Sequence, residues 1–464
     1  MTAEERIASL EAQLKQALEQ WRQTQEELRQ TQEQLAQANR RIEELEKQKT
    51  PPAAFVKANV KKPPEGEKKP RKKRDARHNR ARRREKPTRT IEHQISLCEE
   101  CGSRLGGVSV ARRRQVIELP EPAPVEITEH VIYHGWCSQC QKWREAPVDV
   151  RAEVIGRGRI GVRLGSLMAY LRTVLRLPVR QIQCYLASLH GLHISTGEIV
   201  ELFHRLTRQM QPQVQALQAA IRASPAVQAD ETGWREDGKN GYIWSLSTPR
   251  LRYYQYHHSR GHEVVEDLLG PDFEGVLGSD FYAAYNVYPG LHQRCWVHFL
   301  RDVHELKEKH PQDEALWQWA TDVKALYQQA VNWARQDADP QLSPRKLRQA
   351  RVAHQHAFEQ QLLALCRPFV GKDSPQETLC QRVERFLPEL FVFVTIPEVP
   401  AHNNLAERSV RPLVIARKIS GGSRSPKGSD TRMDLFSLFG TWAAQGLNPF
   451  FQCLAELSSS HSLP

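Results

Sequence analysis

The chain has 464 residues and a formal net charge of +12, a length that allows two or more domains. No apolar run approaches the roughly 18 residues that span a bilayer, and the N-terminus lacks a signal sequence, so we expect a cytoplasmic protein without a membrane partner. The basic balance is typical of nucleic-acid-binding proteins.

A heptad repeat fills residues 1–50. The apolar spacing of three and then four residues predicts a coiled coil with a left-handed supercoil. One position of the repeat is Ile7, Leu14, Trp21, Leu28, Leu35 and Ile42, and the other is Leu10, Ala17, Thr24, Thr31, Ala38 and Leu45. We expect a homo-oligomer formed through this segment; a long helix lying on its own protein is the alternative.

Residues 51–90 are rich in Pro, Lys and Arg. They hold sixteen Lys and Arg against four Asp and Glu, an excess equal to the net charge of the whole chain. Such a basic linker cannot bury a core and should be disordered when free. It is either a solvated tail or a segment that binds the phosphates of double-stranded DNA. The DNA-binding residues expected here are Arg71, Lys72, Lys73, Arg74, Arg82, Arg83 and Arg84.

Two Cys-x-x-Cys pairs lie within residues 91–150. They are Cys98 with Cys101 and Cys137 with Cys140. The pairs predict a zinc-ribbon domain, with a strand-rich stretch over residues 114–133 between them. Four thiolates leave no open coordination position, so Zn²⁺ should be structural. A redox pair and buried thiols are the alternatives.

Residues 151–222 have a helical pattern. A helix over residues 179–189 should end at Gly191, and Ser195 with Glu198 fits a capping box that begins the next helix. Two short helices joined by a tight turn occur in helix-turn-helix DNA-binding domains and also in ordinary helical packing, so both interpretations stay open.

Residues 223–310 predict an α/β domain. Their order of strand, strand, strand, helix, strand, helix matches the ribonuclease-H-like fold, in which the first and fourth strands lie side by side. Residues 311–390 hold a 3.6-residue apolar stripe and predict an all-α insertion. Residues 391–464 should complete the α/β domain with a basic tail. The chain is therefore predicted to be multidomain.

Three acids are placed at the ends of predicted elements. An apolar run leads to Asp230 and breaks at Gly233, which predicts a buried strand with the carboxylate at its carboxyl end. Asp280 follows a second apolar run, and Glu407 lies near the start of an arginine-rich helix. Such carboxylates can converge to hold two divalent metal ions for in-line attack on phosphate. Singly, an Asp after a strand is more often a turn or cap, and Glu407 follows Asn404 at the capping-box offset.

Basic side chains follow Glu407 around Gly421 and Gly422. They suit a DNA strand that lies across the acids. The DNA-binding residues expected in this tail are Arg408, Arg411, Arg417, Lys418 and Arg424.

With these motifs the chain resembles DDE-type transposases, specifically the insertion-sequence-66 family. The family also has an N-terminal helical segment, a basic linker and a zinc-binding motif in this order, so the resemblance covers nearly the whole chain. The motifs that carry it are Asp230-Glu-Thr-Gly-Trp234, Ser279-Asp280-Phe-Tyr-Ala-Ala-Tyr285, Cys295-Trp-Val-His298, Asn403-Asn-Leu-Ala-Glu407-Arg-Ser-Val-Arg-Pro412 and the tail through Gly421-Gly422-Ser423.

The resemblance implies a bacterial, nucleoid-associated enzyme that cleaves and transfers DNA strands at the terminal repeats of its insertion sequence. It implies that Asp230, Asp280 and Glu407 are the catalytic triad and bind Mg²⁺ or Mn²⁺. It also implies small accessory proteins, encoded by the same element, as partners.

Three further residues near these motifs receive other roles. Glu231 should point away from Asp230 along a strand, so we do not expect it to be a ligand. Cys295 and His298 should pack rather than bind metal. The competing functions are a ribonuclease-H-like nuclease and a catalytically inactive, transposase-derived DNA-binding regulator.

Overall fold

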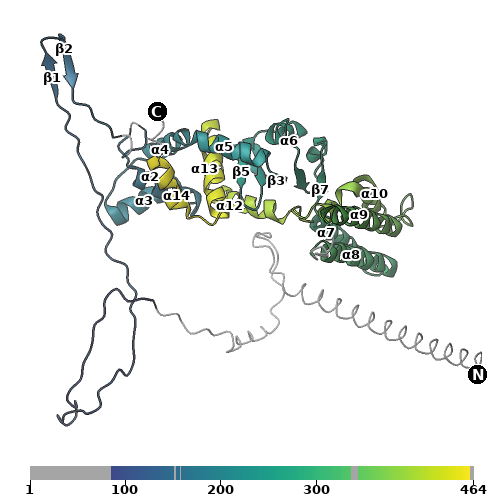
Figure 1. Cartoon of the computed structure of the whole chain (residues 1–464), viewed down its shortest axis with the longest axis horizontal. Helices are drawn as coiled ribbons and strands as arrows, with labels where there is room; N and C mark the ends of the chain where they lie inside the picture. The colour runs from purple at the N-terminus through teal and green to yellow at the C-terminus, as the bar shows by residue number, and fades with distance from the viewer. Residues whose placement is uncertain (1–84, 151–152, 157, 336–342, 460–464) are drawn as a thin grey trace, which may run out of the picture. The chain divides into compact units, whose positions relative to one another are not determined.

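The computed structural model describes residues 85–150, 153–156, 158–335 and 343–459 (Figure 1). The predicted coiled coil and the basic residues 71–84 lie outside the described residues. The chain divides into two compact units, Met1–Glu118 and Leu119–Pro464. Among the described helices, none combines the length and the hydropathy that would carry it across a bilayer.

The strand-rich stretch predicted over residues 114–133 is wrong. These residues contain no strand, and Val116, Ile117 and Ile127 are almost fully exposed. A strand needs a neighbouring strand along its length, and residues 114–132 pair with none, whereas the Tyr133 carbonyl at the end of the stretch accepts the N–H of Ala146 at 2.9 Å. The strands lie instead beside the second cysteine pair, as the antiparallel hairpin β1 (His134–Cys137) and β2 (Lys142–Glu145).

The second unit is built around a five-stranded mixed sheet with the order β5-β4-β3-β6-β7. The first three strands form an antiparallel meander, whereas β6 is parallel to β3 and β7 is parallel to β6. The predicted adjacency of the first and fourth strands of this domain is confirmed. The strands are β3 (Ala226–Glu236), β4 (Lys239–Ser247), β5 (Arg252–His257), β6 (Val276–Ser279) and β7 (His292–Arg294).

The two turns of the meander follow from the residues within them. Asp237 and Gly238 both have positive φ, 50° and 77°, as a tight Asp-Gly hairpin between β3 and β4 requires. Between β4 and β5 the hydroxyl of Thr248 accepts hydrogen bonds from the backbone N–H groups of Arg250 and Leu251, at 3.2 and 3.0 Å. Short-range contacts thus set the register of the meander.

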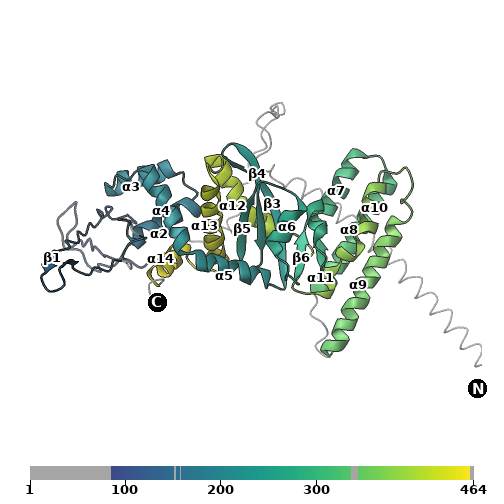
Figure 2. The same cartoon turned by 90° about the horizontal axis from the view of Figure 1, so that it is seen from above.

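Helices cover both faces of the sheet (Figure 2). On one face, α5 (Gln211–Arg222) and α6 (His262–Leu269) pack on side chains such as Trp244. On the other, α12 (Asn404–Ser420) and α13 (Pro426–Ala444) pack on Trp234 and neighbouring residues. The result is a three-layer α/β core, in agreement with the mixed α/β core expected from the sequence.

A helical group adjoins α13 and precedes the sheet in the chain. Its members share one apolar core with α13. They are α2 (Val162–Thr173), α3 (Val179–His190), α4 (Thr196–Gln209) and, from the end of the chain, α14 (Pro449–Ser459). Gly191, with φ of 62°, ends α3, and the Ser195 hydroxyl accepts the N–H of Glu198 at 3.1 Å. The Glu198 carboxylate pairs with Arg159 instead of the cap, so only half of the capping box forms.

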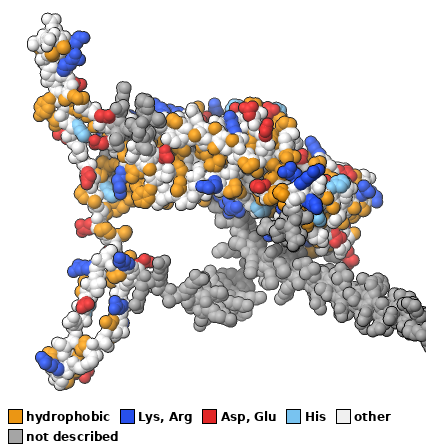
Figure 3. Space-filling view, in the orientation of Figure 1, with side chains coloured by type: hydrophobic (Ala, Val, Ile, Leu, Met, Phe, Trp, Pro, Cys, Tyr) orange, Lys and Arg blue, Asp and Glu red, His pale blue; other side chains and the backbone are white. Residues whose placement is uncertain are grey.

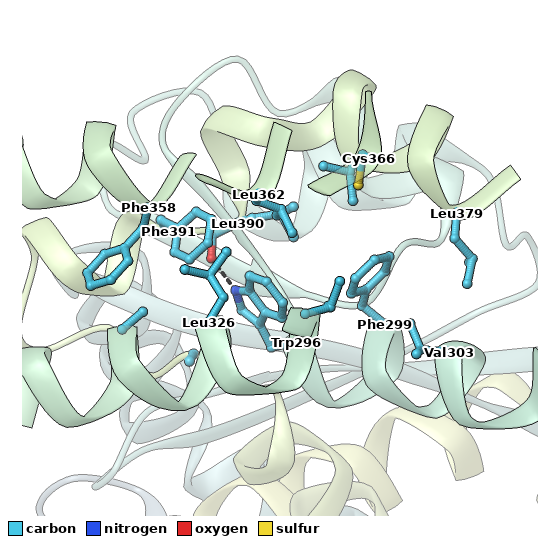
Figure 4. Close-up of a cluster of buried hydrophobic side chains, with 14 of the residues drawn as sticks. Trp296, Phe299, Val303, Leu326, Phe358, Leu362, Cys366, Leu379, Leu390 and Phe391 are labelled. Carbon is cyan, nitrogen blue, oxygen red and sulfur yellow. Dashed lines mark hydrogen bonds between the residues drawn. The ribbon is translucent and has the colours of Figure 1, made fainter. Parts of the chain in front are cut away.

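A second helical group packs beside β7 and has its own core, centred on Trp296 (Figure 4). The Trp296 indole N–H donates to the carbonyl of Leu390, and its ring stacks on Tyr327 with centroids 5.1 Å apart. The buried indole thus links the start of α7 to α8 and to the segment before α11 by direct contact. The group comprises α7 (Trp296–Lys309), α8 (Glu314–Arg335), α9 (Pro344–Cys366), α10 (Glu377–Phe386), η3 (Leu387–Glu389) and α11 (Val392–Thr395).

Candidate active site

Asp230 lies in the middle of β3. The predicted strand end at Gly233 is wrong, because β3 pairs with β4 through to Glu236, with Asp230 opposite Ser245. The parallel neighbour β6 is shorter, and its pairing with β3 stops at Gln228. Asp230 therefore lies just beyond the point where β3 loses its parallel neighbour β6.

Gly233 has a different role from ending the strand. The guanidinium of Arg417, on α12, donates a hydrogen bond to the Gly233 carbonyl and lies 3.4 Å from the Thr232 hydroxyl. A Cβ at position 233 would lie 3.2 Å from Arg417 Nη1. The glycine thus allows α12 to approach β3 closely.

Asp280 follows β6 directly, and its carboxylate accepts the N–H of Tyr282 at 2.9 Å. The backbone at this point is held by Arg294 of β7, a fully buried side chain. Arg294 Nη1 donates to the Asp280 carbonyl at 2.9 Å, and its Nε pairs with Glu389 at 2.6 Å. The buried arginine therefore links the Asp280 turn to the far end of the helical insertion.

Glu407 lies in the first turn of α12. Two buried amides attach this helix start to β3. The Gln228 side chain accepts the N–H of Leu405 at 3.0 Å and donates to the carbonyl of His402 at 3.1 Å. The Asn403 amide donates to the carbonyl of Ala229 at 2.7 Å. These contacts hold the start of α12 against the middle of β3, where the charge of Glu407 acts on Asp230.

The three acids share one electrostatic environment. Burial, and then the negative charges of Glu231, Asp280 and Glu407, together raise the pKa of Asp230 to about 8. One oxygen of Glu407, Oε1, is buried without a hydrogen-bond partner, and His298 Nε2 lies 3.7 Å from it. Repulsion among carboxylates and an orphaned oxygen are what a site for a hard cation presents before the cation binds.

The donor set therefore fits Mg²⁺ or Mn²⁺, but the side chains are not drawn together into a finished site. Within the ranges that the structure describes, no group of three or more His, Cys, Asp or Glu residues stands close enough to hold an ion. The carboxylates would have to move toward one another to bind an ion together. Glu407 is half-buried, and no hydrogen bond at its Oε1 would oppose this movement.

Glu231 is occupied by other partners. Its side chain is 3% exposed; it accepts the Tyr285 hydroxyl at 2.6 Å and the Arg260 Nε–H at 3.0 Å. Burial and the charge of Glu231 hold the pKa of Tyr285 well above its ordinary value, so its hydroxyl stays a donor. Glu231 thus contributes charge beside Asp230 while its own oxygens are satisfied.

Cys295 and His298 have separate environments. Cys295 is buried, and its Sγ accepts the N–H of Asn403 at 3.1 Å, which fits the packing role predicted for it. His298 instead faces Glu407, so the packing interpretation does not describe it fully. The spacing of Cys295 and His298 in the sequence does not indicate that His298 faces Glu407, because that approach depends on the position of α12.

A profile of the transposase IS66 family matches residues 157–431, more than half of the chain. The chain belongs to the transposase IS66 family. The matched residues include all three acids and end within α13. Three relatives come from Sinorhizobium fredii: the uncharacterized proteins y4jO, 26% identical over 39% of this chain, y4jD, 24% over 78%, and y4qI, 23% over 64%. The chain spans about half of the length of y4jO, 74% of y4jD and 59% of y4qI.

The basic tail of the chain divides into exposed residues and one half-buried residue. Arg408, Arg411, Lys418 and Arg424 are exposed, which leaves them open to DNA. Arg417 is half-buried and donates a hydrogen bond to the Gly233 carbonyl of β3; DNA binding by this residue stays a prediction. On the face seen in Figure 3, basic side chains are scattered among acidic and apolar ones.

The two cysteine pairs of the chain form local turns. Cys98 and Cys101 belong to the first unit, where the N–H of Gly102 donates to the Cys98 carbonyl at 2.8 Å. Cys137 and Cys140 belong to the second unit, where the N–H of Cys140 donates to Cys137 Sγ at 3.5 Å. That hydrogen bond is the largest cause that lowers the pKa of Cys137, which favours the thiolate. Zinc binding by all four stays a prediction.

Proposed function

We propose that this transposase cleaves and transfers DNA strands at the ends of its element, with Asp230, Asp280 and Glu407 as the metal-binding acids. One observation carries the proposal: acids from a strand, a strand end and a helix start share a single buried electrostatic environment. Asp230 and Glu407 are 177 residues apart in the sequence. Local helix caps or turns would not bring such distant acids together. The family assignment supports the same reaction class.

The proposed reaction is an in-line attack on a phosphodiester, first by water and then by a 3′-hydroxyl. Two Mg²⁺ or Mn²⁺ ions, when bound by the three acids, would supply activation of the attacking oxygen and stabilisation of the leaving one. The remaining work belongs to the chain. Arg294 and Asn403 hold the backbones that carry Asp280 and Glu407, and His298 Nε2 lies 3.7 Å from the Glu407 carboxylate.

The other predicted modules complete the proposal. Zn²⁺ held by Cys98, Cys101, Cys137 and Cys140 would stabilise the residues between the basic linker and the helical group. The linker and the exposed basic side chains of the tail would bind double-stranded DNA, at both the element ends and the target. The N-terminal heptads would join copies of the chain, as a synapse of two DNA ends requires, with accessory proteins of the same element as further partners.

Substitution of Asp280 by alanine tests the proposal. With Mg²⁺ or Mn²⁺ and a labelled duplex that carries the element's end, Asp280→Ala should lower the cleavage rate at least roughly a thousandfold while it leaves DNA binding intact. Asp272→Ala, at an exposed aspartate nearby, is the matched control and should cut normally. Equal cleavage by Asp280→Ala and the unaltered chain would contradict the acid assignment, and binding without cleavage in both would favour a DNA-binding regulator.

A further inference from the structure

A second candidate site lies apart from the acids, between the N-terminal helical group and the turn that joins α12 to α13. It is an open pocket of about 820 Å³. Four basic side chains from three places in the sequence line it: Arg172 of α2, Arg180 of α3, and Arg424 and Lys427 after α12. These lining residues come from separate segments and meet only in the folded chain. The periodicity of the sequence therefore did not indicate this pocket.

The positive charge of the pocket is poorly compensated. Its acidic lining residue, Glu201, is shared among Arg205, Arg208 and Lys427, at 3.4, 3.1 and 3.5 Å. Within the described part of the chain, no carboxylate forms an ion pair with Arg172, Arg180 or Arg424. Three guanidinium groups thus face the pocket without a protein counter-ion, which favours an anionic ligand.

A further arginine, Arg432 of α13, adds charge near Arg172. Its side chain is 6% exposed, and none of its three guanidinium nitrogens has a hydrogen-bond partner. Burial, and then the charge of Arg172, holds the pKa of Arg432 well below its ordinary value. An anion in the pocket would relieve the repulsion between the two guanidinium groups.

Two helix starts add donors to the same pocket. Pro178 and Val179 begin α3, Thr196 and Gly197 begin α4, and all four line it. The backbone N–H groups at the start of a helix lack intrahelical partners and attract negative charge. The Ser195 side chain before α4 accepts one of these N–H groups, whereas no side chain caps α3 and the Pro178 carbonyl accepts the N–H of Gln181 at 2.9 Å.

We propose that this pocket binds a backbone phosphate of the DNA that the acids cleave. The inference rests on the proposed function and adds a second anchoring point to it. Ser420, the last residue of α12, lines the pocket, whereas Glu407 lies in the first turn of the same helix. Thirteen residues at about 1.5 Å each separate the two points by about 20 Å. At about 3.4 Å per nucleotide, that distance corresponds to roughly six nucleotides from the cut.

The first test compares two double variants of the full chain in their binding to a fluorescent duplex that carries the element's end, without divalent metal. Arg180→Ala/Arg424→Ala removes two exposed pocket arginines, and Arg163→Ala/Arg250→Ala removes two exposed arginines that do not line the pocket. The pocket variant should bind on the order of tenfold more weakly, and the slope of log K against log salt should fall by about 2. The control should keep the affinity and slope of the unaltered chain.

The second test locates the phosphate. Methylphosphonates, which carry no charge, replace one phosphate at a time along the duplex. A replacement roughly six nucleotides from the cut should weaken binding by the unaltered chain and leave binding by the pocket variant unchanged.

The outcomes separate the two proposals. An unaltered affinity and salt slope in the pocket variant, or equal methylphosphonate effects in both proteins, overturns the pocket while cleavage by the unaltered chain still supports the acids. Failure of the unaltered chain to bind the duplex overturns both. Normal binding through the pocket with no metal-dependent cleavage leaves the phosphate site standing and removes the proposed reaction.

Discussion

The acids beside β3 and the cysteine pairs nearer the N-terminus are both predicted metal sites, but the chain supports them differently. Asp280 and Glu407 are carried by backbones that buried side chains hold in place, Arg294 in one case and Asn403 in the other. The cysteine turns are held by contacts within a few residues, and the strands beside Cys137 are exposed. The backbones that carry the acids are thus held by contacts between distant segments, whereas the predicted zinc site is expected to depend on the metal for its stability.

Removal of zinc should have the largest effect, and it should be confined to one region. Because a structural zinc site can contribute on the order of 10 kcal/mol to local folding, chelation should expose residues 91–150 to proteolysis. The thermal transition of the sheet and its helices should change little. Zinc content, limited proteolysis and calorimetry measure these outcomes.

Cysteine variants provide the matched control for zinc. Cys98→Ser/Cys137→Ser should abolish zinc binding, whereas Cys184→Ser, at an exposed cysteine outside the pairs, should retain one ion per chain. Full zinc content in the double variant would contradict the predicted zinc site and remove the contrast between the two regions.

Loss of the Arg294 side chain should destabilise the fold that carries the acids. Arg294→Met removes the partner of Glu389 from a buried position, and such a loss costs about 3 kcal/mol in the free energy of unfolding. Cleavage should fall as well, because the Asp280 turn loses its support. Urea denaturation measures the first effect. Arg385→Met, at an exposed arginine, should stay within about 0.5 kcal/mol of the unaltered chain; an equal loss in both variants would contradict a special role for Arg294.

A smaller effect is expected at the start of α12. Asn403→Ala leaves the carbonyl of Ala229 without its side-chain donor, and the free energy of unfolding should fall by about 1 to 2 kcal/mol. Metal-dependent cleavage should fall more than DNA binding, since Glu407 is four residues away. The neighbouring Asn404→Ala is the control. Should cleavage stay normal in Asn403→Ala, the position of α12 would not depend on this hydrogen bond.

Local patterns accounted for much of the secondary structure. The Ser195 cap and the Gly191 helix end follow from side-chain and backbone preferences within a few residues. The order of the strands followed from apolar runs between turns. The expected end of β3 at Gly233 failed because the glycine serves a contact with Arg417 from a distant helix. That contact also gives Arg417, which is predicted to bind DNA, a hydrogen-bond partner within the chain.

A polar residue within an apolar run was the available signal for Gln228. It lies between Val227 and Ala229 in the strand, and neither of these apolar side chains can hydrogen-bond its amide. Its actual partners, near residue 403, lie about 175 positions further along, beyond the reach of any periodic pattern. The same holds for Arg294 and Glu389.

The sequence by itself determined the strand order of the α/β domain and the residue types that could bind metal and DNA, because turns, caps and alternation act over short distances. The tertiary structure decided which of these residues meet. It brought Asp230, Asp280 and Glu407 close enough for their charges to interact, bonded Arg417 to the Gly233 carbonyl, and gathered Arg172, Arg180 and Arg424 around one pocket. Burial and charge at such meeting points depend on packing between distant segments, which no local pattern contains.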